Sequence, residues 1–429
     1  MLLLLLGVFI FFLVIGTPIA FGLGIAGVIG FIVADPDLMR VIPQRMYSGV
    51  DSFPLMAVPF FVLAGELMGT SGILRRLVRF AEVLVGHVYG GLAQVNIVAS
   101  MIFAGISGSA IADASALGGA LIPGMTKRYG NRNFAAAVTA SAATIGPIIP
   151  PSIPMVVYAF AVGQVSIGGL FLAGVVPGLL MGFGMMVIAY VIARRRNYAP
   201  EGPRANLPTI LQALREAGWA LIMPVIILGG ILGGFFTSTE AAAVAVIYAV
   251  FVGTFVTREL KWVHVNTALA HCVMVSAVVF FLVACSSIVS WILTSSMAPA
   301  QMASGLREIT TNPLVFLLII NVVLLIAGCL LDNIALMIMV APILAPIAVQ
   351  YGIDPLHFGF VFVLNSVIGL LTPPVGAVLF TVCGIAKAPL EKVARESLPF
   401  LLWQIAVLAI VTYIPFVATG LPQYFGYGR

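Results

Sequence analysis

The stretch Thr144-Ile-Gly-Pro-Ile-Ile-Pro-Pro-Ser152 interrupts an apolar run that spans residues 134–161. Proline has no backbone N–H and its ring clashes with the preceding turn, so three prolines within five positions cannot continue a helix. If this run lies in a membrane, the hydrocarbon cannot satisfy the backbone groups that the break leaves unpaired. Such a break survives only inside protein or beside a watery cavity, and it therefore marks a special place in the fold.

The composition places the run in a lipid bilayer. Hydrophobic residues make up 62% of the 429 residues and charged residues only 8%, against roughly 25% in a soluble domain. The apolar runs are continuous and about 20 residues long, which is the length of a helical crossing. The strands of a membrane barrel would instead alternate in polarity over about ten residues. The sequence excludes a water-soluble enzyme, a disordered chain and a disulfide scaffold, and it predicts an all-α polytopic membrane protein.

The apolar runs between polar loops predict the membrane segments. We expect them at residues 2–15, 17–34, 53–72, 91–128, 134–161, 168–193, 218–236, 239–257, 267–297, 314–349, 356–386 and 399–420. Four of these runs are interrupted, namely 91–128, 134–161, 314–349 and 356–386. Whether the break at Gly16-Thr-Pro18 is a kink or a loop stays open at this point.

The basic residues set the orientation of these segments. If 91–128 and 314–349 each enter the membrane and return to the same side, 16 of the 20 Lys and Arg residues share one side. The remaining four are Arg40, Arg45, Arg307 and Arg429. The basic side is cytoplasmic by the positive-inside rule, and both chain ends then face outward. The net charge of +5 therefore reflects retained cytoplasmic charge, and we expect no nucleic-acid partner.

The first two interrupted runs match the last two without a gap at an offset of 223 residues. The matched pairs are Ala104-Gly105 with Ala327-Gly328, Pro123 with Pro346, Gly146 with Gly369, and Pro150-Pro151 with Pro373-Pro374. Each half then holds five crossings and one hairpin, and an odd number of crossings inserts the second copy upside down. Inverted repeats are typical of secondary transporters, whose sites lie at the midplane between the copies.

Four interruptions carry the chemistry, and they are Gly105–Ser115, Thr144–Ser152, Gly328–Asn333 and Asn365–Gly376. Their carbonyl, hydroxyl and carboxylate oxygens suit a hard cation such as Na⁺, and half-helix N-termini attract carboxylates. None of the four contains a Lys or an Arg. We therefore expect an anionic substrate to be held mainly by helix ends, hydroxyls and co-bound cations.

The predicted ligands follow from these residue types. The expected Na⁺ ligands are Ser107, Ser109, Thr144, Gly146, Asp332, Asn333, Gly369 and Thr372. The expected substrate contacts are Ser109, Pro150, Ser152, Asn333, Asn365, Pro373 and Gly376. The competing interpretation is that the Ser and Thr hydroxyls bond back to their own helices.

Other intramembrane polar groups have less weight. Glu66 and Asp113 lie in or near spans, where an ionisable group is functional by default,. Glu240 follows Thr237-Ser-Thr239 and is interpreted as the acidic first turn of a capped helix.

The run Arg75-Arg-Leu-Val-Arg79 is either an interfacial amphipathic helix or a connector arm,. The four cysteines and four histidines show no metal-binding spacing, and we interpret the cysteines as buried and reduced.

At these residues the sequence resembles the large membrane subunit of tripartite ATP-independent periplasmic (TRAP) transporters. The most specific pieces are Gly105–Ser115, Gly146–Ser152, Asp332-Asn333 and Leu371–Gly376, and the resemblance covers essentially the whole chain. It implies an elevator-type carrier in the bacterial inner membrane, driven by a Na⁺ gradient. It also implies two partners, a small four-helix membrane subunit on a separate polypeptide and an extracytoplasmic binding protein that delivers an organic acid.

The resemblance also implies a division into scaffold and transport domains. We expect scaffold helices and a connector arm at 1–90, and the first hairpin and broken helix, in the transport domain, at 91–165. Further scaffold helices, a cytoplasmic linker at 194–217 and the start of the second repeat occupy 166–297. The second hairpin and broken helix occupy 298–386, and a C-terminal scaffold helix occupies 387–429.

Three other interpretations remain beside an organic-acid importer of this kind. The first is a stand-alone ion-coupled carrier of dicarboxylates or inorganic anions, built on a related inverted-repeat fold. The second is an intramembrane protease with Asp113 and Asp332 as its pair, although the chain has neither a GxGD nor an HExxH motif. The third is a channel, which a pair of closed hairpins fits less well than alternating access. The substrate itself, whether sialic acid, a C4-dicarboxylate or another carboxylate, is left open.

Overall fold

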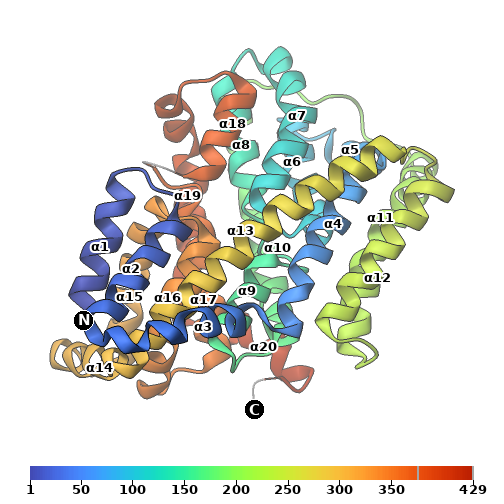
Figure 1. Ribbon diagram of the computed structural model, residues 1–429. Helices are drawn as coiled ribbons and strands as arrows, with labels where there is room; N and C mark the ends of the chain where they lie inside the picture. The colour runs from blue at the N-terminus through green and yellow to red at the C-terminus, as the bar shows by residue number, and fades with distance from the viewer. Residues whose placement is uncertain (374–375, 428–429) are drawn as a thin grey trace.

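The computed structural model describes residues 1–373 and 376–427, and within these ranges the chain is built from helices without strands (Figure 1). Eight helical segments of the described residues are long and apolar enough to cross a membrane. They are η2 with α4 (Phe53–Thr70), α10 (Ile167–Arg195), α11 (Leu207–Leu232), α12 with η3 (Ser238–Val256), α13 (Trp262–Ser295), α15 (Pro313–Leu330), α16 (Asn333–Gln350) and α19 (Leu390–Tyr413). The prediction of an all-α polytopic protein is confirmed. Pro374 and Arg429 lie outside the described residues.

The remaining helices complete the described chain. They are α1 (Leu2–Val14), α2 (Ile19–Ala34), η1 (Pro36–Val41), α3 (Ile42–Val50), α5 (Ile73–Val85), α6 (Gly91–Ser107), α7 (Ala110–Tyr129), α8 (Arg132–Ala143), α9 (Ile153–Val162), α14 (Ala298–Ile309), α17 (Pro355–Gly369), α18 (Ala377–Ala386) and α20 (Phe416–Tyr424). The short helices α3 and α14 were not anticipated from the sequence. Both are amphipathic rather than apolar, so a search for apolar runs does not find them,.

The structure answers one open question about the boundaries and differs from the expected ones at two places. The break at Gly16-Thr-Pro18 is a turn, because α1 and α2 pack side by side and Gly16 adopts a φ of +87°. The run 399–420 is two helices, since α19 ends at Tyr413 and Pro415 precedes α20. The helix α11 begins inside the expected linker 194–217, so the connector between the halves is shorter than expected. Proline near the first position of α11 is compatible with a helix start, because its missing N–H would be unpaired there anyway.

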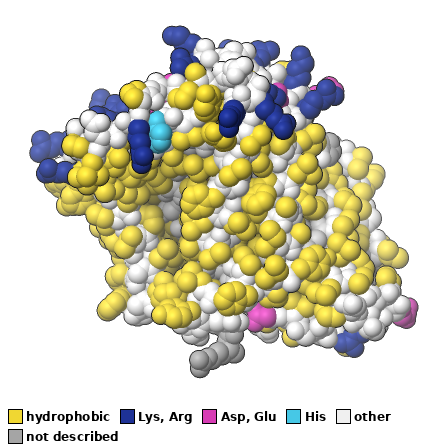
Figure 2. Space-filling view, turned by 180° about the vertical axis from the view of Figure 1, so that it is seen from behind, with side chains coloured by type: hydrophobic (Ala, Val, Ile, Leu, Met, Phe, Trp, Pro, Cys, Tyr) yellow, Lys and Arg dark blue, Asp and Glu magenta, His cyan; other side chains and the backbone are white. Residues whose placement is uncertain are grey.

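The charges and the hairpins agree with the predicted orientation. Lys and Arg side chains gather at the end of the molecule where α5, α7 and α18 lie, and few appear at the other end (Figures 1 and 2). Arg128, at the end of α7, donates to the carbonyl of Pro200 at this basic end (3.1 Å). Tyr351, just after α16, donates to the carbonyl of Thr310 beside α14 at the opposite end (3.0 Å). The hairpins α6–α7 and α15–α16 therefore enter from opposite faces, as the inverted repeat requires.

Helix contacts repeat in matched pairs across the two halves. In the sequence match at offset 223, α7 corresponds to α16 and α9 to α18. In the structure, α7 packs against α18 while α16 packs against α9. Likewise α4 packs against α12 while α13 packs against α2, and α10 packs against α19. Each repeat thus completes the packing of the other, which is what two copies related by an axis in the membrane plane would do.

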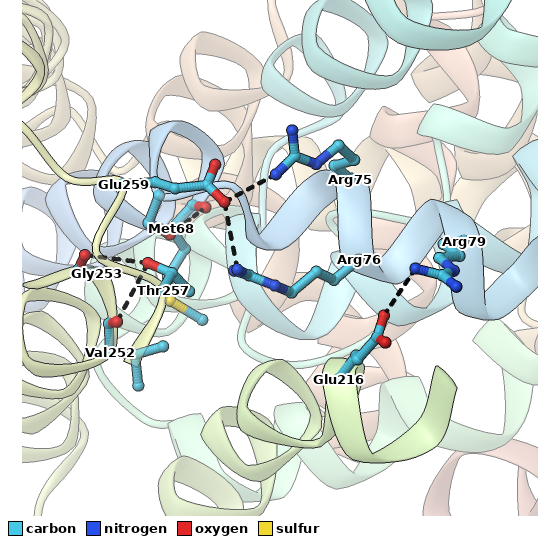
Figure 3. Close-up of polar contacts among 10 residues, drawn as sticks. Met68, Arg75, Arg76, Arg79, Glu216, Val252, Gly253, Thr257 and Glu259 are labelled. Carbon is cyan, nitrogen blue, oxygen red and sulfur yellow. Dashed lines mark hydrogen bonds and ion pairs between the residues drawn. The ribbon is translucent and has the colours of Figure 1, made fainter. Parts of the chain in front are cut away.

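The helix α5 is tied to the helices around it at the basic end of the molecule (Figure 3). It packs against α6 and α11. Arg75 and Arg76 both donate to Oε1 of Glu259, at 2.8 and 3.2 Å, and Arg79 donates to Glu216 on α11 at 3.2 Å. These contacts are compatible with both sequence interpretations of this run, an interfacial amphipathic helix and a connector arm.

Candidate functional site

The first hairpin turns at Gly108 and Ser109. Gly108 adopts a φ of +61°, a conformation that favours glycine, and a Cβ atom there would lie 2.6 Å from the carbonyl oxygen of Pro151,. The carbonyl of Gly108 accepts a hydrogen bond from the backbone N–H of Ile153 (3.4 Å). Ser109 caps α7, and its Oγ accepts from the N–H of Ala112 (3.4 Å). The tip of this hairpin therefore rests directly on the break between α8 and α9.

Asp113 carries the charge at this tip, and its side chain is fully buried. The Ser107 hydroxyl donates to Oδ1 of Asp113. Its Oδ2 lies against Gly146, where any Cβ atom would collide with it, and has no hydrogen-bond partner among the described residues. A buried carboxylate with one oxygen left unpaired is unfavourable unless a cation or a proton accompanies it. The sequence analysis gave Asp113 little weight, whereas in the structure its side chain lies where the first hairpin meets the first broken helix.

The break in the first broken helix is held by hydroxyls and an amide. The Thr144 hydroxyl donates to a carbonyl of its own helix (2.6 Å) and accepts from Nε2 of Gln404 on α19 (2.9 Å). The Ser152 hydroxyl donates to the carbonyl of Pro147 (2.6 Å) and caps α9. The Pro150-Pro151 peptide bond between them is cis. Thr144 thus makes the backbone bond that the competing interpretation expects, while its oxygen also accepts from a second helix.

The second hairpin turns at Asp332 and Asn333. Asp332 caps α16, with its Oδ2 accepting from the N–H of Ile334 (3.0 Å), and the Asn333 side chain is buried. Behind this tip, Gly328 packs on Gly369 so closely that a Cβ atom at Gly369 would lie 2.7 Å from the Gly328 Cα. The second hairpin therefore meets the second broken helix backbone to backbone, without side chains between them.

An amide chain supports the second broken helix. Nδ2 of Asn365 donates to both the carbonyl and the Oδ1 of Asn321 on α15, at 3.0 and 2.8 Å. Nδ2 of Asn321 in turn donates to the Thr412 hydroxyl on α19 (3.0 Å). The Thr372 hydroxyl donates to the carbonyl of Ile368 (2.9 Å). The Asn365 amide N–H groups are thus used structurally, and only its Oδ1, unpaired among the described residues, is left to bind anything else.

Four half-helices begin at these breaks: α7 after Ser109, α9 after Ser152, α16 after Asp332 and α18 after Gly376, with Pro373 in the turn ahead of α18. The helices α7 and α18 lie side by side, as do α9 and α16. Helix N-termini carry partial positive charge, and the ends of α6, α8, α15 and α17 supply carbonyl oxygens.

The starts of α7 and α18 lie at the same depth. Gly118 and Ile385 each stand eight residues beyond the first residue of their helix, and a Cβ atom at Gly118 would lie 3.2 Å from the Ile385 side chain. Both helices run toward the basic end of the molecule in Figure 1. The first hairpin tip and the break of the second broken helix therefore lie near one another.

Two acidic residues that the sequence flagged lie elsewhere. Glu66, on α4, contacts Nδ1 of His271 on α13 at 2.8 Å. Glu240 forms a capping box with Thr237 at the start of α12, and its Oε2 accepts from the Thr237 N–H at 2.8 Å. The cap assigned to Glu240 from the sequence is confirmed.

Sequence reasoning missed the buried amides around the site. Gln404 reaches Thr144 from α19, Asn321 holds Asn365, and Asn96 on α6 donates to the Thr139 hydroxyl on α8 (2.6 Å). Each is a single amide inside an apolar run, so a list of every uncharged polar residue within the spans would have found them.

Inverted repeats with two hairpins and two broken helices define the fold of a secondary transporter. The family described as "Tripartite ATP-independent periplasmic transporter, DctM component" matches residues 6–417. The chain therefore belongs to this family and is a large permease subunit of a TRAP transporter, a multi-pass protein of the inner membrane and not an enzyme. The family description makes it one component of a three-part transporter.

Individual relatives agree with this assignment. The C4-dicarboxylate TRAP transporter large permease protein of Pseudomonas aeruginosa is 42% identical, over 94% of this chain and 94% of its own length. The sialic acid TRAP transporter large permease protein of Vibrio cholerae is 42% identical, over 96% and 97%. The isethionate TRAP transporter permease protein of Oleidesulfovibrio alaskensis is 42% identical over 98% of this chain, but the match spans only 65% of that relative.

A solved structure shares the fold. The YdaH transporter of Alcanivorax borkumensis superimposes with a TM-score of 0.61, over 90% of this chain and 89% of the other. At 15% sequence identity this likeness concerns the fold alone.

Proposed function

We propose that this chain is the transmembrane subunit that carries a small organic acid into the cell, coupled to Na⁺ and by an elevator motion. The observation that carries the proposal is that four half-helices begin at the breaks and pack in two pairs, α7 with α18 and α9 with α16, beside a buried carboxylate oxygen that has no partner among the described residues. The N-termini favour an anion, and the carboxylate and nearby carbonyls favour a cation. A site that suits both at once is suited to cotransport.

The cation would bind at each hairpin tip. In the first repeat, Oδ2 of Asp113 faces Gly146, and Ser107 already contacts the same carboxylate. In the second repeat, Asp332 caps the tip and Gly369 ends the first half of the broken helix. Asn333, Ser109, Thr144 and Thr372 would supply further oxygens. Broken-helix carbonyls with few carboxylates are the ligand type that Na⁺-coupled carriers use.

The substrate would lie between the N-termini of the four half-helices. Ser109, Ser152 and Asn333 stand at three of these N-termini, Pro373 and Gly376 precede the fourth, and Pro150 and Asn365 border the breaks. The names of the relatives refer to C4-dicarboxylates, sialic acid and isethionate, all of them organic anions. We therefore propose an organic acid as the substrate class, without choosing among its members.

The partners would be a separate small membrane subunit and an extracytoplasmic binding protein. The family description of a tripartite transporter supports three components. The large permease proteins of Pseudomonas aeruginosa and Vibrio cholerae match this chain over nearly their whole length, which supports a separate small subunit.

The elevator motion would divide the molecule along its helix contacts. The hairpins and broken helices of both repeats pack on one another through α7 with α18 and α9 with α16. The helices α2, α4, α12 and α13 form a second packed group. Movement of the first group against the second would carry the site across the membrane while each group keeps its internal contacts.

Uptake into proteoliposomes tests the proposal. The large subunit, the small subunit and the binding protein are reconstituted, and uptake of succinate, isethionate and N-acetylneuraminate is measured with and without a Na⁺ gradient. Uptake that requires both Na⁺ and the binding protein is expected. Uptake by this chain alone, without the binding protein, would reject the tripartite arrangement in favour of a stand-alone carrier, and a steady uncoupled current would favour a channel.

Variants then test the ion site. Asp332→Ala, Ser109→Ala and Asp113→Asn should each raise the Na⁺ concentration for half-maximal uptake, with membrane insertion unchanged. Asp51→Asn, at an exposed carboxylate beside α3, is the matched control and should behave as the parent protein does. Unchanged Na⁺ titrations in all three site variants would mean that the hairpin tips are only structural.

A further inference from the structure

A cavity of about 350 Å³ lies between the two packed groups of helices, and none of the residues at the four breaks lines it. Its walls are α3 and α13 on one side and α9 and α16 on the other, and these helices meet in the half of the molecule opposite the basic end (Figure 1). This volume is within the usual range of small-molecule sites. The cavity is therefore large enough for a small organic anion and faces the extracytoplasmic side.

The lining of this cavity combines one positive charge with hydroxyl groups. Its polar lining residues are Arg45, Ser48, Ser286, Ser287, Ser290 and Thr294. Arg45 is the charged residue of the described lining, and in the part of the chain that the structure describes it makes no ion pair. Its guanidinium lies over the ring of Trp291, 5.5 Å from the centroid, and Trp291 also lines the cavity. This stacking holds the guanidinium in place while leaving its N–H groups free.

The cavity lies close to the second hairpin tip. Ile338 and Pro342 of α16 line it, and Ile338 is five residues from Asn333 at the tip. At 1.5 Å per residue this is about 7.5 Å along the helix axis. The Ser286 hydroxyl on α13 donates to the carbonyl of Ile338 (3.0 Å), so the cavity wall includes a hydrogen bond that joins the two groups of helices. An anion bound in this cavity would therefore lie near the second hairpin tip.

We propose that this cavity is a receiving site for the organic anion on its way to the hairpin tips, with Arg45 as the group that binds its carboxylate or sulfonate. The proposal rests on the proposed function, because it takes its ligand class from there. A planar guanidinium binds a carboxylate through two parallel hydrogen bonds, and the serine and threonine oxygens suit the hydroxyl groups of such acids. Because the four breaks contain no Lys or Arg, a cationic site ahead of them would raise the local concentration of the anion,.

Trp291 offers a direct readout of binding. Trp219, Trp262 and Trp403 are replaced by Phe, leaving Trp291 as the one tryptophan of the chain. The purified large subunit, without binding protein, is titrated with succinate, isethionate and N-acetylneuraminate while its emission is followed. A saturable change with at least one acid is expected. No saturable change with any of the three overturns the proposal.

Charge variants identify the binding group. Arg45→Gln should weaken the affinity at least tenfold, since hydrogen bonds between charged groups are roughly twice as strong as those between neutral groups, and Arg45→Lys should restore part of the affinity. Arg40→Gln is the matched control, because Arg40 is a neighbouring basic residue that does not line the cavity. A titration that is equal in Arg45→Gln and in the parent overturns the assignment.

The same variants in the uptake assay separate this proposal from the proposed function. If Na⁺-driven uptake is present and Arg45→Gln leaves the half-saturating acid concentration unchanged, the receiving site is wrong and the transporter stands. If the change in Trp291 emission depends on Arg45 but uptake does not depend on Na⁺, the proposed receiving site is supported and the proposed Na⁺ coupling is wrong.

Discussion

The contact between Gly328 and Gly369 makes a quantitative prediction. A Cβ atom at Gly369 would lie 2.7 Å from the Cα and carbonyl carbon of Gly328, whereas ordinary contact begins at 3.4 Å. The substitution Gly369→Ala therefore has to push α15 and α17 apart by about 0.7 Å, and both contacting groups are backbone. Overpacking of this kind destabilises proteins by roughly 1–3 kcal/mol. We expect a loss of stability in this range.

The matched control lies in the same broken helix. Gly384, on α18, has nothing within 4 Å of a Cβ atom, so Gly384→Ala should stabilise slightly because alanine is a better helix former by about 0.5–1 kcal/mol,. The two variants make the same chemical change with opposite expected signs. The free energy of unfolding is measured by titration with a denaturing detergent.

Transport should depend on the same contact between Gly328 and Gly369. The Gly328–Gly369 contact joins the second hairpin to the second broken helix just behind Asp332, so Gly369→Ala should also lower Na⁺-dependent uptake at matched amounts of inserted protein. Gly384→Ala should leave uptake unchanged. If both variants have the stability and uptake of the parent, then the close packing at this tip does not hold the site, and the reasoning fails.

Three further predictions concern polar contacts. Gln404→Leu removes the amide that donates to Thr144 and should destabilise the protein by about 1 kcal/mol, the scale of an interhelical hydrogen bond in a membrane protein, as a detergent titration can check. Asn365→Ala removes two bonds to Asn321 and should destabilise it by a similar amount,; a shift in the half-saturating acid concentration would show that the residue also contacts the substrate. Glu259→Gln releases Arg75 and Arg76 of α5 (Figure 3) and should change stability by no more than about 1 kcal/mol at low salt and less at high salt, because the pairs are partly exposed,. A loss well above this value at high salt would contradict a screened surface contact.

The sequence predicted the breaks because their cause is local. Proline cannot continue a helix wherever it lies, so Pro147, Pro150 and Pro151 mark a break without any knowledge of neighbours,. The helix caps at Ser109 and Asp332 could be predicted as well, because a cap also depends on residues adjacent in the sequence. The position of Asp113 could not be predicted in this way. Its Oδ2 lies against Gly146, and the two residues come together only when the hairpin packs on the broken helix.

Amphipathic and mixed segments were less predictable. The helices α3 and α14 and the first turns of α11 lie outside the apolar runs, and what they pack against decides whether they form,. Arg45 illustrates the consequence: from the sequence it is one of four extracytoplasmic basic residues, and only its position on α3 opposite α13 places it in a cavity with Trp291.

The sequence by itself determined that this protein lies in a membrane, which side carries its charges, where its helices break and that the breaks occur in two matched copies. These features follow from composition, positive charge and proline geometry, which act through the chain's local chemistry and its solvent. The tertiary structure decided which breaks face one another, which oxygen of Asp113 is left without a partner, and how Gln404 and Asn321 reach the site from other helices. Those facts depend on contacts between residues far apart in the chain, and only the packing of both repeats together creates them.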